Sequence, residues 1–399
     1  MSTKNPPPAV DNFHPDPPGR VRVHHEGPGR WDDAVMARPP RDDLAFIDAA
    51  ARLWDETSHD VGYQSRLFAM TALPYKNPGD GLPVWERTNG GLTLSVEQGR
   101  PTKLPDGSWE PMGYPFGSIP RLLMAWLTTE VVRRRERMVD LGGTSFNEFS
   151  RQLNLQPDRS KNGVGRRLRA QTRRLLRAHI SVEFHESRAG ASQEAFRDVS
   201  IASAYDLWWS EAEPDQSSFL PSYVEVSERF FKEVMEHPVP IDMNAMRLLS
   251  GSPLRLDIYV WLTYRMSYLT RQSKIPWDAL MAQFGSNAKS RSGIHRFQTD
   301  FAERLAQVCT VYRDANVEVS GYGVTLRPSL PHVLPKKRTF AIPASATKTS
   351  PPTAQPPKFV PDAHEPAAPE HVPGYIADLR AALPKGRTEA PMGPTDSTQ

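Results

Sequence analysis

The chain has 399 residues, of which 38% are hydrophobic and 24% charged, and this composition suits a globular protein with two domains and additional irregular segments. No run approaches the roughly eighteen consecutive apolar residues that span a bilayer, and the N-terminal residues lack the pattern of a secretory signal, so we expect a cytoplasmic protein with no membrane contact. The single cysteine excludes an internal disulfide, and no Cys/His cluster has zinc-like spacing, so we expect no metal site and no cofactor. The net charge is only +3, so the distribution of charge along the chain matters more than its sum.

Proline is concentrated at the two ends of the chain. Residues 1–40 and residues 331–399 are rich in Pro and poor in apolar side chains, and such segments cannot bury a core. We predict that both are disordered tails.

The ordered part is predicted to begin with a helix that is followed by short strands. Apolar residues at helical spacing define the buried face of this helix, namely Leu44, Ile47, Ala51 and Trp54. Residues 66–71 are short and apolar, and residues 92–96 alternate in polarity, two patterns typical of strands.

Two well-marked helices come next. The first is predicted over residues 118–137, with Ser118 as its cap and Pro120 in its first turn. The second begins after Ser145, which has capping-box spacing to Glu148. Its apolar stripe is predicted to consist of Phe146, Phe149 and Leu153.

A polar turn, a third helix and two strands complete the first structural unit. The helix is predicted over residues 164–178 and the strands over residues 180–185 and 197–205. Helix, helix, turn, helix, strand, strand is the order of a winged helix-turn-helix domain, which we assign to residues 41–210.

The same order recurs about 130 residues later. A helix over residues 254–269 contains VWLTY, which echoes AWLT in the earlier helix. A short helix beginning near Pro276, a longer helix over residues 291–308 and strands over residues 311–319 and 324–327 follow. We assign residues 218–330 to a second domain. The predicted fold is therefore α+β, with two tandem winged helix-turn-helix domains between Pro-rich tails.

The third helix of the first unit carries the main functional signal. Residues 159–177 contain eight Lys or Arg and no Asp or Glu. At 100° per residue, four of the arginines fall within a sector of about 80°, opposite an apolar side. A guanidinium row binds phosphate and guanine edges, whereas a merely solvated face usually mixes charges of both signs. The candidate DNA-binding residues here are Lys161, Arg166, Arg167, Arg169, Arg173, Arg174 and Arg177.

The corresponding helix of the second unit is less charged. Its basic and polar residues gather near its start, where the amides of a helix also attract phosphate. Taken alone, this pattern suits an ordinary surface helix equally well. The candidate DNA-binding residues here are Lys289, Arg291, His295, Arg296 and Thr299.

Other basic and exposed positions remain open to two interpretations. The arginines at 133–135 and at 137 suit either a complement to the helix dipole or phosphate contacts. Arg188 and Tyr322, in the turns of the two hairpins, suit either wing contacts with DNA or ordinary turns.

The patterns of common enzymes are missing from the sequence. There is no P-loop of the form GxxxxGK[ST], and no pair of carboxylates is spaced for a common face. His24 and His25 lie in the Pro-rich tail, so a metal-dependent nickase is disfavoured. We expect a protein that is not an enzyme.

Several long runs resemble plasmid-encoded replication initiators of the RepA type. They lie within residues 61–333 and read LFAMTALPYKNPGD (67–80), GYPFGSIPRLLMAWLTTEVVR (113–133), HPVPIDMNAMRLL (237–249), SPLRLDIYVWLTYRMSYL (252–269) and IPWDALMAQFG (275–285). The resemblance implies a protein that binds repeated double-stranded DNA sites in a plasmid origin, promotes origin opening and recruits host replication proteins such as the helicase. It also implies tandem winged-helix domains and a possible homodimer.

Two alternatives stay open at this point. A winged-helix transcriptional regulator would use the same surface at a promoter. A DNA-processing enzyme, such as a nickase or primase, would need a site assembled from residues far apart in the sequence.

Overall fold

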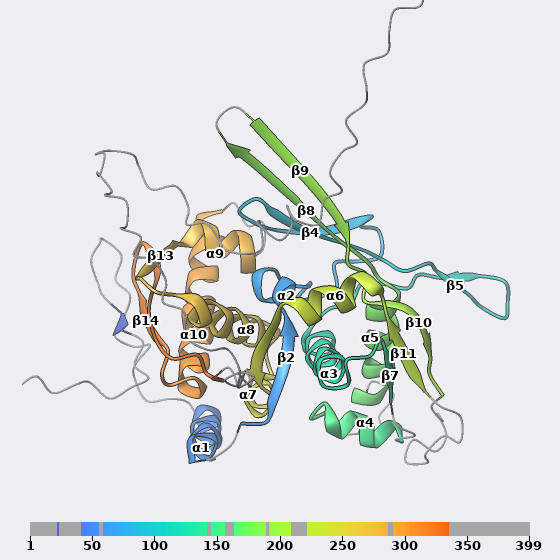
Figure 1. The fold of residues 1–399 in the computed structure, drawn as a ribbon, viewed down its shortest axis with the longest axis horizontal. Helices are drawn as coiled ribbons and strands as arrows, with labels where there is room; N and C mark the ends of the chain where they lie inside the picture. The colour runs from blue at the N-terminus through green and yellow to red at the C-terminus, as the bar shows by residue number, and fades with distance from the viewer. Residues whose placement is uncertain are drawn as a thin grey trace, which may run out of the picture. The chain divides into compact units, whose positions relative to one another are not determined.

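A computed structural model of the chain describes residues 22–23, 41–55, 59–141, 145–155, 163–188, 191–208, 222–285 and 290–334. All of these belong to one compact body, Met1–Lys336, which contains both of the predicted structural units. Apart from residues 22–23 and 331–334, both predicted tails lie outside the described residues. The mixture of helices and sheets confirms the predicted α+β class (Figure 1).

The elements up to residue 110 are α1 (Arg41–Asp55), β2 (Val61–Ser65), α2 (Arg66–Met70), β3 (Val84–Asn89), β4 (Leu92–Glu97), β5 (Thr102–Lys103) and β6 (Trp109–Glu110). The prediction of a strand over residues 66–71 was wrong, because this segment forms helix α2. The Ser65 hydroxyl accepts a hydrogen bond from the Leu67 amide at 3.2 Å and so caps the helix. A short apolar run does not distinguish a buried strand from a buried helix by its periodicity.

The predicted helices of the first unit are present. The unit continues with α3 (Ser118–Arg134), β7 (Met138–Asp140), α4 (Phe146–Gln152), α5 (Val164–Arg177), β8 (His179–Arg188), β9 (Ala191–Asp198) and β10 (Ala202–Asp206). Ser145 caps α4 by accepting from the Glu148 amide at 3.2 Å, as predicted. The predicted stripe is also confirmed, since Phe146, Phe149 and Leu153 are all buried. Helix α3 begins at residue 118 as predicted, but Gly117 rather than Ser118 is in the cap position, and the helix ends at Arg134 rather than at residue 137.

The second predicted strand of this unit is divided in two. Strands β8 and β9 form a long antiparallel hairpin, which is joined to β3 and β4 in the order β3-β4-β8-β9. The chain then bends where the Ser200 amide donates to the Asp198 carboxylate at 2.9 Å. Strand β10 belongs to another sheet, of order β10-β11-β7, so β7 does not pair with the hairpin of its own unit.

The second unit, predicted over residues 218–330, begins with β11 (Tyr223–Val226), α6 (Glu228–Glu236), β12 (Pro238–Asp242) and α7 (Met243–Leu249). It continues with α8 (Pro253–Tyr268), β13 (Ser273–Pro276), α9 (Trp277–Phe284), α10 (Arg291–Val311), β14 (Asn316–Val319) and β15 (Gly323–Arg327). Here β13, β14 and β15 form one antiparallel sheet, with β15 in the middle. Helix α10 continues to Val311, so the predicted strand from residue 311 begins only at Asn316.

Strand β1 (Arg22–Val23) pairs in parallel with β14. The prediction that residues 1–40 are a disordered tail was therefore wrong for these two residues. They add an outer strand to the sheet of the second unit, because the free edge of β14 offers unpaired backbone groups.

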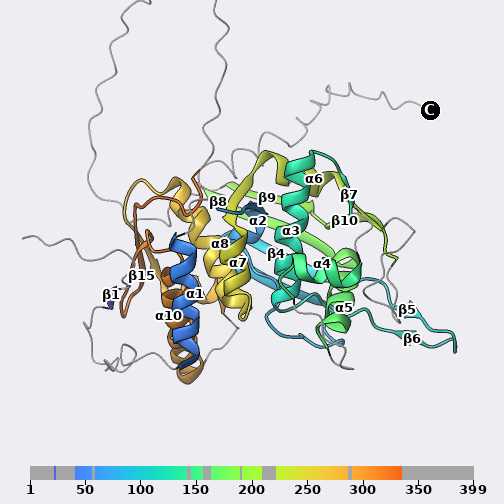
Figure 2. The same cartoon turned by 90° about the horizontal axis from the view of Figure 1, so that it is seen from below.

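Helix α1 packs on the second unit rather than on the first, to which it was assigned. It contacts α10 and α7 (Figure 2). Its predicted face was also wrong, because Leu44 is 50% exposed and Trp54 39% exposed. Phe46, Ala50 and Leu53 face the core instead. The predicted domain boundaries stay a prediction, since residues of both units share one hydrophobic core.

Two links join the units within this core. Strand β2, near the start of the chain, pairs antiparallel with β12. Helices α3 and α8 are joined by a buried ion pair between Arg121 and Asp257, in which Nε and Nη2 each donate to a carboxylate oxygen at 2.7 Å. Such a bidentate pair fixes both the distance and the relative orientation of the two groups.

Candidate nucleic-acid interface

Helix α5 is anchored by one side in the core. Leu168 and Leu175 are fully buried, and the Gln171 side chain accepts a hydrogen bond from the Phe116 amide at 2.8 Å. On the other side Arg166, Arg167 and Arg173 are exposed. The helix therefore has the two faces that its sequence pattern predicts.

The remaining three arginines of α5 are half-buried and contact neighbouring segments. The Arg169 guanidinium lies 4.2 Å from the centre of the Phe146 ring on α4. Arg174 Nε donates to the Met112 carbonyl at 3.1 Å. The predicted row of four arginines is thus exposed at Arg166 and Arg173 only, because Arg169 and Arg177, at the two edges of the sector, reach a neighbouring ring and a neighbouring hydroxyl.

The arginines of α5 differ in their ion pairing from those at the end of α3. Among the residues that the structure describes, no carboxylate pairs with Arg167, Arg173, Arg174 or Arg177. At the end of α3, by contrast, Arg134 pairs with Glu130 at 2.9 Å. The positive charges of these four arginines are therefore less neutralised than that of Arg134.

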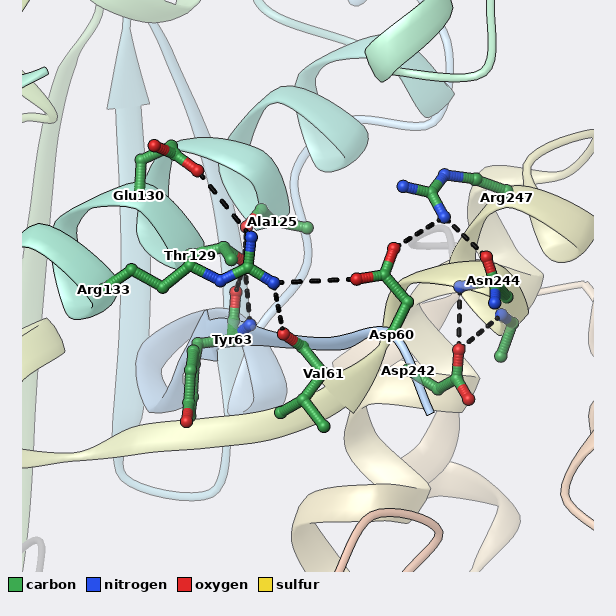
Figure 3. Close-up of polar contacts among 11 residues, drawn as sticks. Asp60, Val61, Tyr63, Ala125, Thr129, Glu130, Arg133, Asp242, Asn244 and Arg247 are labelled. Atoms are coloured by element: carbon green, nitrogen blue, oxygen red, sulfur yellow. Dashed lines mark hydrogen bonds and ion pairs between the residues drawn. The ribbon is translucent and has the colours of Figure 1, made fainter. Parts of the chain in front are cut away.

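The arginines at and just after the end of α3 make contacts within the fold. Arg133 donates to the Val61 carbonyl at 2.8 Å and lies 3.6 Å from Asp60, which also pairs with Arg247 on α7 (Figure 3). Arg137 pairs with Glu225 at 2.9 Å. Of the two interpretations of this run, phosphate binding is the one that these contacts disfavour.

The start of α10 is a second exposed basic surface. Arg291, His295 and Arg296 are exposed, and Ser290 caps the helix by accepting from the Gly293 amide at 3.2 Å. Thr299 is half-buried, and its hydroxyl donates to the His295 carbonyl at 3.1 Å. This internal bond uses the hydroxyl proton, so Thr299 is a weaker candidate than the two arginines.

Three predicted positions cannot be placed with their side chains. Lys161 and Lys289 lie outside the described residues, and so does the side chain of Arg188. In the other hairpin, Tyr322 is 59% exposed.

A hairpin that the sequence analysis missed contacts α5. Strands β5 and β6 pair across a turn in which Gly107 has a φ of 88°, and Trp109 at its end is 65% exposed. The Thr102 hydroxyl lies 3.3 Å from Arg173 and 3.4 Å from Arg177. The Asp106-Gly107 pair is a turn signal in the sequence, but contact with a helix more than sixty residues away gives no local signal.

No helix in the described part of the chain combines the length and the apolar character that crossing a membrane requires.

Comparisons with known proteins bear on residues 114–279. These residues match the model of a family described as plasmid encoded RepA protein. The matched segment contains α3, α5 and α8 and ends within α9, so α10 lies beyond it.

Two further comparisons add little to this match. A search of the curated proteins found no match. A crystal structure of domain2 and domain 3 of RctB is similar at 13% identity, over 60% of this chain and 81% of that chain, with a TM-score of 0.36. A similarity of this size carries no argument about fold or function. The family match over residues 114–279, however, confirms the resemblance to plasmid-encoded RepA proteins that was inferred from the sequence.

Proposed function

We propose that the chain is a plasmid replication initiator that binds repeated double-stranded DNA sites in its origin. The observation that carries this proposal is helix α5, which is anchored in the core by Leu168 and Leu175 and exposes arginines on its other side. The major groove of B-DNA admits one helix, and guanidinium groups bind phosphates and guanine edges there. The family match of the segment that contains α5 supports the same function.

In this proposal both units are winged helix-turn-helix domains. The order helix, strand, helix, helix, strand, strand occurs in both, from α3 to β9 and from α8 to β15. Helices α5 and α10 are then the recognition helices, and the turns of the two hairpins are the wings. The three antiparallel strands β13, β14 and β15 of the second unit support this assignment, because β13 pairs with the hairpin strand β15.

The two recognition helices act as one body. The buried Arg121–Asp257 pair and the β2–β12 pairing resist relative movement of the units. We therefore expect each chain to contact two groove segments at one fixed spacing. The proposed activity is DNA binding at this fixed spacing and involves no chemical reaction. In this proposal the protein is not an enzyme, and DNA binding needs no cofactor.

Origin opening, contacts with host replication proteins such as the helicase, and a homodimeric form are further parts of this proposal. Their support is the family match alone. They are separable from DNA binding, since each has its own assay.

The first experiment is a footprint of the full chain on DNA that flanks its own gene. Regularly repeated protected sites are the expected result, and a single palindromic site would instead indicate a transcriptional regulator. Cleavage of the DNA or synthesis of a primer in the presence of a divalent metal would contradict the assignment as a non-enzyme.

The second experiment tests α5 directly. The variant R166A/R173A removes two exposed side chains that lie about 20° apart around the helix axis. We expect at least tenfold weaker binding and, if both contact phosphates, a log–log salt slope that is smaller by about 1.8. The control variant R52A/K232A removes the same charge from exposed positions on α1 and α6 and should bind normally. Equal binding by the two folded variants would refute the role of α5.

A further inference from the structure

Two histidines and one aspartate from three distant segments converge, and none of them is among the proposed DNA-binding residues. One ligand atom from each of His59, Asp242 and His332 lies within 4.8 Å of the other two. His59 precedes β2, Asp242 ends β12, and His332 follows β15. From this cluster we infer that the protein binds one divalent metal ion of the Zn²⁺ type through His59, Asp242 and His332.

The carboxylate of Asp242 is held ready for this role. It is buried, and its Oδ1 accepts hydrogen bonds from the Asn244 and Ala245 amides at 2.7 and 3.2 Å, as the cap of α7 (Figure 3). Its other oxygen, Oδ2, lies 2.5 Å from His59 Nδ1. One oxygen thus fixes the orientation of the carboxylate while the other points into the cluster.

His332 is positioned by two tyrosines. The Tyr259 hydroxyl lies 2.8 Å from His332 Nδ1, and it also accepts a hydrogen bond from the Asp242 amide at 2.9 Å. The Tyr312 ring lies 4.9 Å from the imidazole ring, centre to centre. The Tyr259 hydroxyl thus holds the imidazole of His332 in place, as an additional hydrogen bond does for most metal-binding histidines.

The geometry requires a modest rearrangement. Ligand atoms about 2.0 Å from a tetrahedral Zn²⁺ lie about 3.3 Å from one another. The distance of 2.5 Å between His59 Nδ1 and Asp242 Oδ2 would have to lengthen by about 1 Å. The longest distance between two ligand atoms of the cluster, which is at most 4.8 Å, would have to shorten by up to about 1.5 Å. The His59 side chain is 44% exposed, so it can move and leaves one ligand of the cluster in contact with solvent.

The chemistry of the ligands favours zinc over magnesium or calcium. Imidazole suits Zn²⁺ and neighbouring transition metals, whereas Mg²⁺ and Ca²⁺ prefer oxygen. The ion would tie the segment before β2 and the segment after β15 to the β12–α7 junction. Its role would therefore be to hold the ends of the described unit together, independently of DNA binding.

The experiment is a titration of the metal-free full chain with Zn²⁺, followed by calorimetry, and with Co²⁺, followed by its visible absorption. We expect one ion per chain, the intense absorption of tetrahedral Co²⁺ and a higher melting temperature with Zn²⁺. The variant H59A should fold, because His59 is largely exposed, and should bind at least tenfold more weakly. H332Q should do the same.

A matched control is H185A, which removes a 54% exposed histidine on β8 and should bind Zn²⁺ like the unmodified chain. Either of two results would overturn the inference. One is the absence of stoichiometric binding by the unmodified chain at micromolar Zn²⁺. The other is unchanged affinity and unchanged Co²⁺ absorption in H59A, which would place the ion elsewhere.

Discussion

Replacing Asp257 with asparagine tests how strongly the two units are joined. The substitution keeps the shape of the side chain but removes the negative charge beside Arg121. The side chains of Arg121 and Asp257 are only 5% and 9% exposed, so water cannot replace the lost partner. Removal of one member of a buried ion pair costs about 3–5 kcal/mol of folding free energy.

The surroundings of Arg121 place the expected loss near the lower end of that range. Its guanidinium also donates to the carbonyls of Leu73, Pro74 and Gly117, at 2.7, 3.2 and 2.7 Å. These three bonds survive the substitution and continue to solvate part of the charge. We therefore expect D257N to lower the free energy of unfolding by about 3 kcal/mol.

The assay is urea unfolding followed by circular dichroism, with a surface pair as control. Arg134 and Glu130 lie one helical turn apart on α3 and are 40% and 17% exposed, so E130Q should cost less than about 1 kcal/mol. The double variant R121M/D257L removes both charges but also the donor of three carbonyl groups, so it should recover only part of the loss. A cost for D257N no larger than that for E130Q would refute the argument that this pair holds α3 to α8.

Three further predictions concern the second unit. The variant R291A/R296A should weaken origin binding and reduce the salt slope without changing the melting temperature, since both side chains are exposed; unchanged binding in a footprint would remove α10 from the interface. Burial raises the pKa of the Cys309 thiol to about 12, so about one molecule in ten thousand carries a thiolate at pH 8. A thiol reagent should therefore label Cys309 only after unfolding, and rapid labelling of the folded protein would contradict its burial. Gly323 has a φ of 155°, and an added Cβ would meet the Ile275 carbonyl, so G323A should lose about 1–3 kcal/mol in a urea titration. The control G81A adds its Cβ in open space and should unfold like the unmodified chain.

Local signals in the sequence were sufficient for several elements. The capped helix α4 and its buried Phe146, Phe149 and Leu153 were predicted correctly, because a cap and an apolar stripe are set by residues within one or two turns. The anchored and exposed sides of α5 were predicted for the same reason. The family resemblance also needed no structure, since long runs of residues carry it.

The tertiary structure decided what depends on residues far apart in the chain. Only the fold shows that Arg169 stacks on Phe146, that β2 pairs with β12, and that α1 turns Ala50 rather than Leu44 toward the core. The spacing of Cys and His along the sequence predicted no metal site. The fold nevertheless brings His59, Asp242 and His332 together, although they are spread over 274 positions of the sequence. Helix periodicity and capping act over a few residues, whereas such contacts arise only when packing brings distant segments together.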